Sequence, residues 1–229
     1  MPSLPGVLAD PMTRWMGRPA TVEAVDRLSP GLVRMAFKGD ALRGRKWGPG
    51  SEIEFRVSTR DFRHYTASAF DDEAGRIEVV FQLHGHGPGD TWVRAVTAGD
   101  EVLVLGPGNR SWLRPGTRHL FAGDASALGH FSGLIAGLPA GSEVLGAVEV
   151  PEADLAAAAA LVPGVTVLAG TANPGDAVLA WLREHSGAAP DAAYLAGHAQ
   201  SIQRHRAALN MRRQDVVTKP FWATGKAGL

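Results

Sequence analysis

Residues 63–66 of this chain read Arg-His-Tyr-Thr, which places a cation, a phenol and a small hydroxyl close together. The guanidinium of Arg63 can bind a pyrophosphate, and the phenol of Tyr65 can cover the face of an aromatic ring. The hydroxyl of Thr66 can contact a polar atom of the same ring. This combination suits a ligand that joins a flat ring system to phosphate groups, as a flavin dinucleotide does.

A glycine-rich segment follows, in which residues 84–88 read His-Gly-His-Gly-Pro. Glycine amides can approach phosphate oxygens closely, because no Cβ stands in the way. Residues 90–96 have the length of one short helix, whose N-terminus would face the glycines and present its positive dipole to a phosphate. The two segments in this order predict a flavin site more strongly than either does alone.

The segments lie in the first of two halves of different character. Residues 1–17 form an N-terminal extension, and residues 18–114 are predicted to form a small antiparallel β-barrel that binds FAD. Runs of apolar and β-branched residues between turn signals predict its strands at 21–25, 32–37, 77–81 and 101–105.

The second half, residues 117–229, alternates apolar strands with segments of helical length. This pattern predicts an α/β Rossmann-like domain with a parallel sheet that binds NAD(P). In such sheets ligands bind beyond the carboxyl ends of the strands, so loops 123–126 and 197–200 are candidate sites. The strands are expected at 119–122, 144–148, 165–168, 192–196 and 216–218, and the helices near 126–137, 152–160, 176–185 and 199–212.

Composition excludes several classes of function. The 23 Lys and Arg balance the 23 Asp and Glu, so no global field attracts nucleic acid or an anionic membrane. The absence of cysteine excludes disulfides, thiolate catalysis and Cys-ligated metal centres. His84 and His86 are followed by no third ligand at suitable spacing, so we expect no metal site. With no secretory leader and no long apolar run, we expect a cytoplasmic monomer without integral membrane association.

Four segments together resemble the siderophore-interacting proteins, the FAD-dependent ferric-siderophore reductases of the ferredoxin-reductase-like superfamily. Residues 84–92 (HGHGPGDTW) resemble the family segment HGxGPxxxW, and residues 121–127 (FAGDASA) are similar to its AGDETA loop. Residues 196–197, with the arginines that follow, resemble an AGE helix start with its basic face. Residues 221–225 (FWATG) resemble a YWRxG ending. The resemblance covers nearly the whole chain and implies a two-domain architecture like that of ferredoxin-NADP reductase.

The departures from the family pattern lie mostly in the second half. The chain has Ala125 and His198 where the family has Glu, and Ser68 where it commonly has Arg. It also has Phe221 and Ala223 where the family has Tyr and Arg. The FAD half therefore matches better than the nicotinamide half.

The resemblance implies that Tyr65 packs beside the isoalloxazine of FAD, that Thr66 approaches its N5 edge and that Arg63 meets the pyrophosphate. Asp124 has a second interpretation as the N-cap of the next helix, and Trp222 has one as a core residue. The implied cofactor-binding residues are Arg63, His64, Tyr65, Thr66, His84, Gly85, Gly87, Pro88, Thr91, Trp92, Asp124 and Trp222.

Arg204, Arg206 and Lys219 form a locally basic end of the chain. They are either a solvated helix face or a substrate-binding surface for an acidic ligand, such as the 2′-phosphate of NADPH or an anionic ferric siderophore. No side chain is expected to act as a nucleophile or general base, because flavin chemistry needs none.

The function that the resemblance implies is reduction of siderophore-bound Fe(III), with electrons from NADPH or NADH passing through FAD and Fe(II) released. Nothing local in the sequence names a siderophore, so a general NAD(P)H:flavin or electron-transfer reductase is one alternative. The missing acidic residues at 125 and 198 motivate another alternative, a non-enzymatic FAD- or siderophore-binding module.

Overall fold

The computed structural model describes residues 17–59, 61–85, 87–108 and 112–226. The chain divides into two compact units, Met1–Ser111 and Trp112–Leu229. Each unit has a hydrophobic core of its own. Within the described ranges, no helix is both long and apolar enough to cross a membrane.

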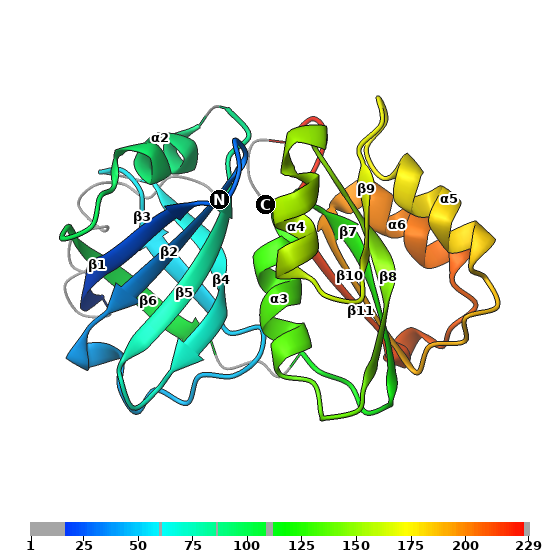
Figure 1. Ribbon diagram of the computed structural model, residues 1–229, viewed down its shortest axis with the longest axis horizontal. Helices are drawn as coiled ribbons and strands as arrows, with labels where there is room; N and C mark the ends of the chain where they lie inside the picture. Colours follow the sequence, from blue (N-terminus) through cyan, green and yellow to red (C-terminus); the bar gives the residue numbers. More distant parts are fainter. Residues whose placement is uncertain (1–16, 60, 86, 109–111, 227–229) are drawn as a thin grey trace. The chain divides into compact units, whose positions relative to one another are not determined.

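The first unit is a closed barrel of six antiparallel strands, which confirms the predicted barrel (Figure 1). The strand order is β1-β2-β5-β4-β3-β6, so the closing contact is between β6 and β1. The strands are β1 (Arg18–Arg27), β2 (Leu32–Lys38), β3 (Glu52–Arg56), β4 (Phe62–Asp71), β5 (Arg76–Gln82) and β6 (Glu101–Gly108). A 3-10 turn, η1 (Asp40–Leu42), follows β2.

Aromatic side chains fill the barrel. Alternate residues of a strand point inward, and Phe37, Phe55 and Phe81 are the largest that do so. The ring centroid of Phe55 lies 4.8 Å from that of Phe37 and 6.1 Å from that of Phe81. Each fully buried phenylalanine stabilises the fold by about 1.5–3 kcal/mol. These rings form a rigid interior against which β3, β4 and β5 are fixed.

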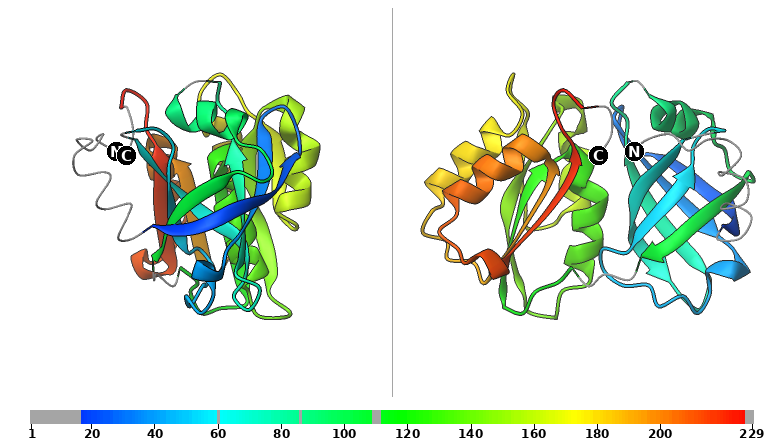
Figure 2. Two further views of the ribbon diagram at one scale, coloured as in Figure 1. Left: turned by 90° about the vertical axis from the view of Figure 1, so that its left-hand side faces the viewer. Right: turned by 180° about the vertical axis from the view of Figure 1, so that it is seen from behind.

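One short helix, α2 (Pro88–Ala95), lies across one end of the barrel (Figures 1 and 2). It begins at Pro88, two residues before the predicted start, because proline suits the first helical position, where its missing N–H leaves no bond unmade. Val93 and Trp92 turn toward the core. The glycine-rich loop thus leads directly into a helix that is anchored to the barrel.

The second unit is a parallel five-stranded sheet, as predicted, with the order β11-β10-β7-β8-β9. Helices α3 and α4 cover one face, and α5 and α6 cover the other (Figure 1). The strands are β7 (Arg118–Asp124), β8 (Glu143–Val150), β9 (Thr166–Ala169), β10 (Ala192–His198) and β11 (Val216–Trp222). The helices are α3 (Leu128–Ala136), α4 (Leu155–Leu161), α5 (Asp176–Glu184) and α6 (Ala199–Ala208), with 3-10 turns η2 (Ala125–Ala127), η3 (Glu152–Asp154) and η4 (Arg213–Asp215).

The strand order reverses between β7 and β10. From β7 the chain moves outward to β8 and β9, and it then returns to the other side of β7 to form β10 and β11. Such a reversal opens a crevice at the carboxyl ends of the two adjacent strands. Asp124 ends β7 and His198 ends β10, so both predicted loops lie at this point.

Candidate functional site

All four residues of the Arg-His-Tyr-Thr segment lie on β4, in a stretch where the strand is paired on one edge alone. From Arg63 to Thr66, β4 pairs with β3, but its pairing with β5 begins only at Ala67. The other edge of this segment therefore has no ladder partner among the described strands. Unpaired strand edges present backbone donors and acceptors to whatever lies beside them. This edge can therefore offer main-chain groups as well as side chains to a ligand.

Tyr65 joins β4 to helix α2. Its ring packs edge-on against Phe81, with centroids 4.6 Å apart. A Cβ placed on Gly89 would lie 2.9 Å from the Tyr65 hydroxyl oxygen, so only glycine lets the helix approach this closely. Burial raises the pKa of Tyr65 to about 12, with Arg63 acting to lower it and Asp90 to raise it. The phenol is therefore neutral near pH 7 and keeps its proton for donation.

The hydroxyl of Thr66 is a buried polar group with no hydrogen-bond partner. Thr66 is 5 % exposed, and leaving such a hydroxyl unbonded costs about 1–3 kcal/mol. On the same face of the strand, His64 Nδ1 lies 3.3 Å from Glu54 Oε1 on β3. The uncompensated hydroxyl is the feature expected of a site that a polar ligand completes.

Arg63 is only loosely engaged by the protein. Its guanidinium donates to the carbonyl of Phe62 at 2.9 Å and lies 3.9 Å from Asp61 Oδ1. The side chain is one-third exposed. It therefore keeps donors that can turn toward an anion, and Gly89 of α2 lies against its Cγ.

The glycine-rich loop is held by a carboxylate that the sequence analysis did not single out. Asp90 Oδ1 accepts the N–H of His84 at 2.9 Å, and its Oδ2 accepts the N–H of Gly85 at 3.0 Å. The N–H of Gly85 is therefore already bonded within the chain. Gly85 and Gly87 have φ values of 91° and 98°, which other residues rarely adopt, so these glycines allow the loop its observed shape.

The start of α2 leaves amide groups for a ligand. Its N-cap, Gly87, offers no side-chain hydrogen bond, and Pro88 has no N–H. The hydroxyl of Thr91 donates to the carbonyl of Gly87 at 3.2 Å. Trp92 packs between Phe55 and the rest of the core, with a centroid distance of 5.1 Å, so it supports the helix from within the barrel. His86, the other histidine considered as a metal ligand, lies outside the described residues.

Asp124 is the centre of a polar network in the second unit. One oxygen accepts the N–H of Ser126 at 2.9 Å and caps the turn η2, in line with the N-cap interpretation. The other accepts the N–H of His198 at 2.7 Å and the indole N–H of Trp222 at 3.0 Å. Asp124 therefore ties together the ends of β7, β10 and β11, and a Cβ on Gly197 would collide with its carboxylate.

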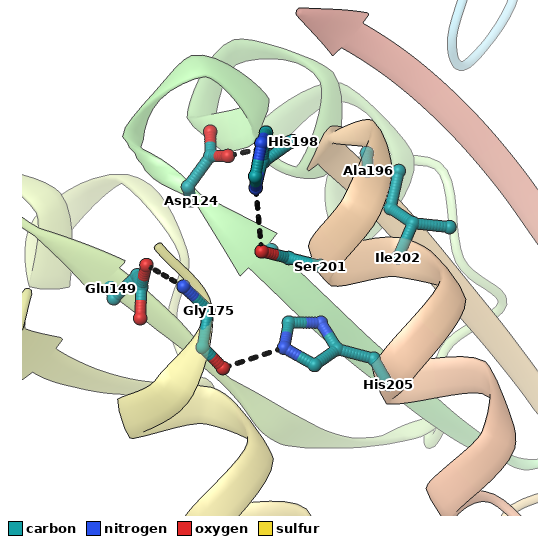
Figure 3. A pocket seen from close by; sticks show the side chains of 9 residues that line it. Asp124, Glu149, Gly175, Ala196, His198, Ser201, Ile202 and His205 are labelled. Carbon is teal, nitrogen blue, oxygen red and sulfur yellow. Dashed lines mark hydrogen bonds between the residues drawn. The ribbon is translucent and has the colours of Figure 1, made fainter. Parts of the chain in front are cut away.

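Both ring nitrogens of His198 have partners, and Figure 3 shows its bonds to Asp124 and Ser201. Its Nδ1 lies 2.8 Å from the hydroxyl of Ser201, and its Nε2 lies 2.9 Å from that of Thr224. The ring stacks on Trp222 at a centroid distance of 4.2 Å. Burial lowers the pKa of His198, with Asp124 acting to raise it and Arg204 to lower it. A neutral ring that both accepts and donates fits this setting.

Glu149 and His205 bond to the backbone of Gly175, the N-cap of α5, from opposite sides (Figure 3). The Glu149 carboxylate accepts the N–H of Gly175, and His205 Nε2 lies 2.8 Å from the carbonyl of Gly175. Burial raises the pKa of Glu149 and lowers that of His205. The space among these side chains, Asp124 and His198 is too small for a water molecule. This edge of the sheet is thus a closed polar cluster.

The three predicted substrate-binding cations do not gather on one surface. Arg204 pairs with Asp176 of α5 and donates to the carbonyl of Pro174, so it fastens α6 to α5. Arg206 lies two residues further along α6 and so points to another side of the helix. Lys219 Nζ lies 4.6 Å from the ring centroid of Trp112, and its neighbour Phe221 packs near His130 of α3, on the opposite face of the sheet.

Sequence reasoning missed Gly89 and Asp90 in the barrel, and Glu149 and His205 in the sheet. Gly89 and Asp90 stand within the motif that was recognised, and the signal was a carboxylate six residues after His84 on a helix start. Glu149 directly follows the strand expected at 144–148, so its position near the carboxyl edge was readable. Nothing in the sequence pairs it with His205.

Comparison with known proteins agrees with this architecture. A model of the siderophore-interacting FAD-binding domain matches residues 56–111, and a model of the siderophore-interacting protein family matches residues 116–225. The ferric vibriobactin reductase ViuB of Vibrio cholerae is 26% identical over 178 residues, which cover 72% of this chain. The match spans 65% of the length of that relative.

Solved structures extend the comparison to the whole fold. The siderophore-interacting protein SipS from Aeromonas hydrophila has a TM-score of 0.73 and 26% identity, covering 93% of this chain and 94% of that one. Phthalate dioxygenase reductase has a TM-score of 0.76 at 13% identity, covering 92% and 70%, which shows a shared fold. The chain therefore belongs to the siderophore-interacting protein family, with a ferredoxin-reductase-like fold and an FAD-binding domain.

Proposed function

We propose that this protein is an FAD-dependent ferric-siderophore reductase. Electrons would pass from NADPH or NADH through FAD to siderophore-bound Fe(III), and Fe(II) would be released. The observation that carries the proposal is the unpaired strand edge at Arg63–Thr66, where a buried hydroxyl has no partner. Family membership supports FAD, and the name of the Vibrio relative supports a ferric reductase.

The residues around this strand edge suit FAD in chemical type. Arg63 would bind the pyrophosphate together with the amides at the start of α2, because a guanidinium and a positive helix end both favour phosphate. Tyr65 would lie beside the isoalloxazine as a neutral donor, and Thr66 would satisfy its hydroxyl on the ring. His64, His84, Gly85, Gly87, Pro88, Thr91 and Trp92 would hold the strand, loop and helix in place around these contacts.

In the second unit, Asp124 would act through Trp222. The carboxylate holds the indole, and Trp222 stays 38% exposed, so one aromatic surface remains available to a ligand ring. Pyridine nucleotides are the donors named for phthalate dioxygenase reductase, which shares the fold. Arg206 and Lys219 remain proposed contacts for an acidic ligand, while Arg204 is already paired.

Bound FAD would supply the exchange between a two-electron donor and a one-electron acceptor. The protein's part is to hold the rings and exclude side reactions. The electron transfer to iron requires no described side chain to act as a nucleophile or general base. Fe(II) has a lower charge density than Fe(III), so hard oxygen ligands hold it less tightly and the iron can leave. On this proposal the enzyme works as a monomer in the cytoplasm, where nicotinamide nucleotides are available.

The proposal is tested by anaerobic mixing of the FAD-loaded protein with NADPH or NADH, followed by a ferric siderophore. Loss of the visible flavin absorption on addition of nucleotide, and its return with trapped Fe(II) on addition of siderophore, is the expected result. Equal or faster turnover with ferric citrate, cytochrome or ferredoxin would contradict the substrate and favour a general electron-transfer reductase.

A second candidate function follows from the closed polar cluster around Asp124 and Glu149. Asp124 and His198 are bonded within the chain, the space among the side chains is too small for a water molecule, and the carboxylates of Glu149 and Asp176 at the start of α5 oppose a phosphate. This arrangement favours an FAD- and siderophore-binding module that takes no nicotinamide nucleotide. Flavin absorption that neither nucleotide bleaches, in a protein that still binds FAD, would select this candidate.

A further inference from the structure

Asp90 buries a carboxylate beside the proposed phosphate site. The residue is 4% exposed, and both its oxygens accept backbone N–H groups of the glycine-rich loop, from His84 and Gly85. Burying a carboxylate costs several kcal/mol unless hydrogen bonds and opposite charge compensate. A negative group here would also repel a phosphate. A buried acid at this position therefore indicates a structural role that offsets these costs.

Two side chains reach Asp90 from the solvent side. Arg94, one turn further along α2, carries the opposite charge and lies 3.4 Å from Oδ2, and the His84 ring lies 3.7 Å from Oδ1. Both of these side chains are about half exposed, at 51% and 56%. The charge is thus balanced outside the loop, while the buried oxygens fix the loop from within.

The loop contains glycines, so its backbone can adopt many conformations unless other contacts restrict it. Gly85 and Gly87 both take positive φ, a region that glycine enters and leaves with little cost. The carboxylate of Asp90 accepts two hydrogen bonds from the loop and so restricts the backbone of residues 84–85 to one conformation. Asp90 also stands next to Gly89, which lies against Tyr65, so one turn of α2 sets the loop and the flavin strand together.

We infer that Asp90 is the positioning residue of the phosphate-binding loop. It holds the loop in its ligand-ready conformation before a ligand arrives, and it thereby favours flavins that carry a pyrophosphate. The inference rests on the proposed FAD site. Asp90 acts through the loop amides and the start of α2, and touches no reacting atom.

The test compares the affinities of Asp90→Asn for FAD and for riboflavin, which lacks phosphate, by fluorescence titration. Asparagine keeps the size of the side chain but replaces one acceptor with a donor, so one loop amide loses its partner. The dissociation constant for FAD should rise about tenfold, which corresponds to one lost hydrogen bond, while that for riboflavin changes less than about twofold. Asp26→Asn, an exposed barrel carboxylate paired with Arg34, should change neither.

Hydrogen exchange of the flavin-free protein supplies a second readout. The amides of His84 and Gly85 should exchange at least about tenfold faster in Asp90→Asn than in the wild type. Should this variant not fold, Asp90→Ser, whose hydroxyl can accept from one amide, carries the same expectations.

Three results would overturn the inference. They are a parallel loss of FAD and riboflavin affinity, tighter FAD binding as expected from relief of charge repulsion, and unchanged exchange at His84 and Gly85. If the wild type binds neither flavin, the proposed function fails. The exchange rates then still decide whether Asp90 holds the loop.

Discussion

The two units differ in how the central polar groups at their candidate edges are used. Among the described barrel residues, the Thr66 hydroxyl has no partner, the Arg63–Thr66 edge pairs with no strand on one side, and no side chain caps α2. In the sheet, Asp124 and His198 form their hydrogen bonds inside the chain, and although Glu149 Oε2 and His205 Nδ1 beside them have no partner, the space among these side chains is too small for a water molecule. The barrel edge thus leaves groups that a ligand could bond, whereas the central carboxylate of the sheet edge is used by the fold.

One carboxylate organises each edge, and the two edges differ in which hydrogen-bonding groups remain for a ligand. Asp90 takes two loop amides and leaves the start of α2 open. Asp124 takes a loop amide, a strand-end amide and an indole, and closes the space. The comparison predicts that substitutions in the sheet edge act mainly on stability, and that substitutions at the barrel edge act mainly on ligand affinity.

Replacement of Asp124 by alanine should give the largest loss of stability. It removes every acceptor for Ser126, His198 and Trp222 and leaves a buried amide unbonded, so the free energy of unfolding should fall by about 3 kcal/mol. Urea unfolding measures this, with Glu152→Ala as an exposed acidic control in the same unit. A loss no greater than that of the control would remove Asp124 from the centre of the network.

Acid should weaken the sheet unit through His130. Burial lowers the pKa of His130 to about 3, with Lys219 adding to the effect, whereas the unfolded chain has the ordinary value. The unfolded state therefore takes up this proton first as pH falls below about 6.5, and stability drops by about 2 kcal/mol between pH 7 and pH 5.

Unfolding of His130→Gln at both pH values checks this contribution. The variant should lose less stability than the wild type over that interval, while a variant at the exposed C-cap of α5, His185→Gln, should follow the wild type. Parallel curves for all three proteins would show that His130 does not carry the acid sensitivity.

Gly89→Ala should lower affinity at the barrel edge with a smaller effect on stability. The added Cβ meets the Tyr65 hydroxyl at 2.9 Å, so α2 or the Tyr65 ring must shift. We expect FAD binding to weaken about tenfold, equivalent to about 1.4 kcal/mol. Gly48→Ala is the matched control, because a Cβ there meets nothing within 4 Å. Equal affinities for the two variants would break the link between α2 and Tyr65.

The sequence predicted the architecture because its signals are local. Apolar runs of strand length, separated by turns in the first half and by helical segments in the second, gave the parallel sheet and most barrel strands near their observed positions. No predicted strand range covered β4 (Phe62–Asp71), which carries the Arg-His-Tyr-Thr segment. The boundaries moved by a few residues, as at α2, where Pro88 starts the helix early. The Arg-His-Tyr-Thr segment and the glycine-rich loop were also found, since each is contiguous.

The contacts that decide how the edges work could not be predicted, because they join residues far apart in sequence. The sequence alone does not indicate that His198 and Trp222 bond to the same carboxylate oxygen of Asp124. It also does not indicate that Glu149 and His205 meet at Gly175. The basic residues near the C-terminus show the same limit. Arg204 and Lys219 are close in the sequence, but β11 and α6 direct them to opposite faces of the sheet.

The central claim is that FAD completes the barrel edge by satisfying the Thr66 hydroxyl. Calorimetric titration of the wild-type protein and Thr66→Val with FAD, together with the stability of the flavin-free forms, tests it directly. We predict one FAD per chain for the wild type and about tenfold weaker binding for Thr66→Val, whose flavin-free form is at least as stable because a buried unbonded hydroxyl is gone. Absence of FAD binding to the wild type, or equal affinity in the variant, would contradict the account.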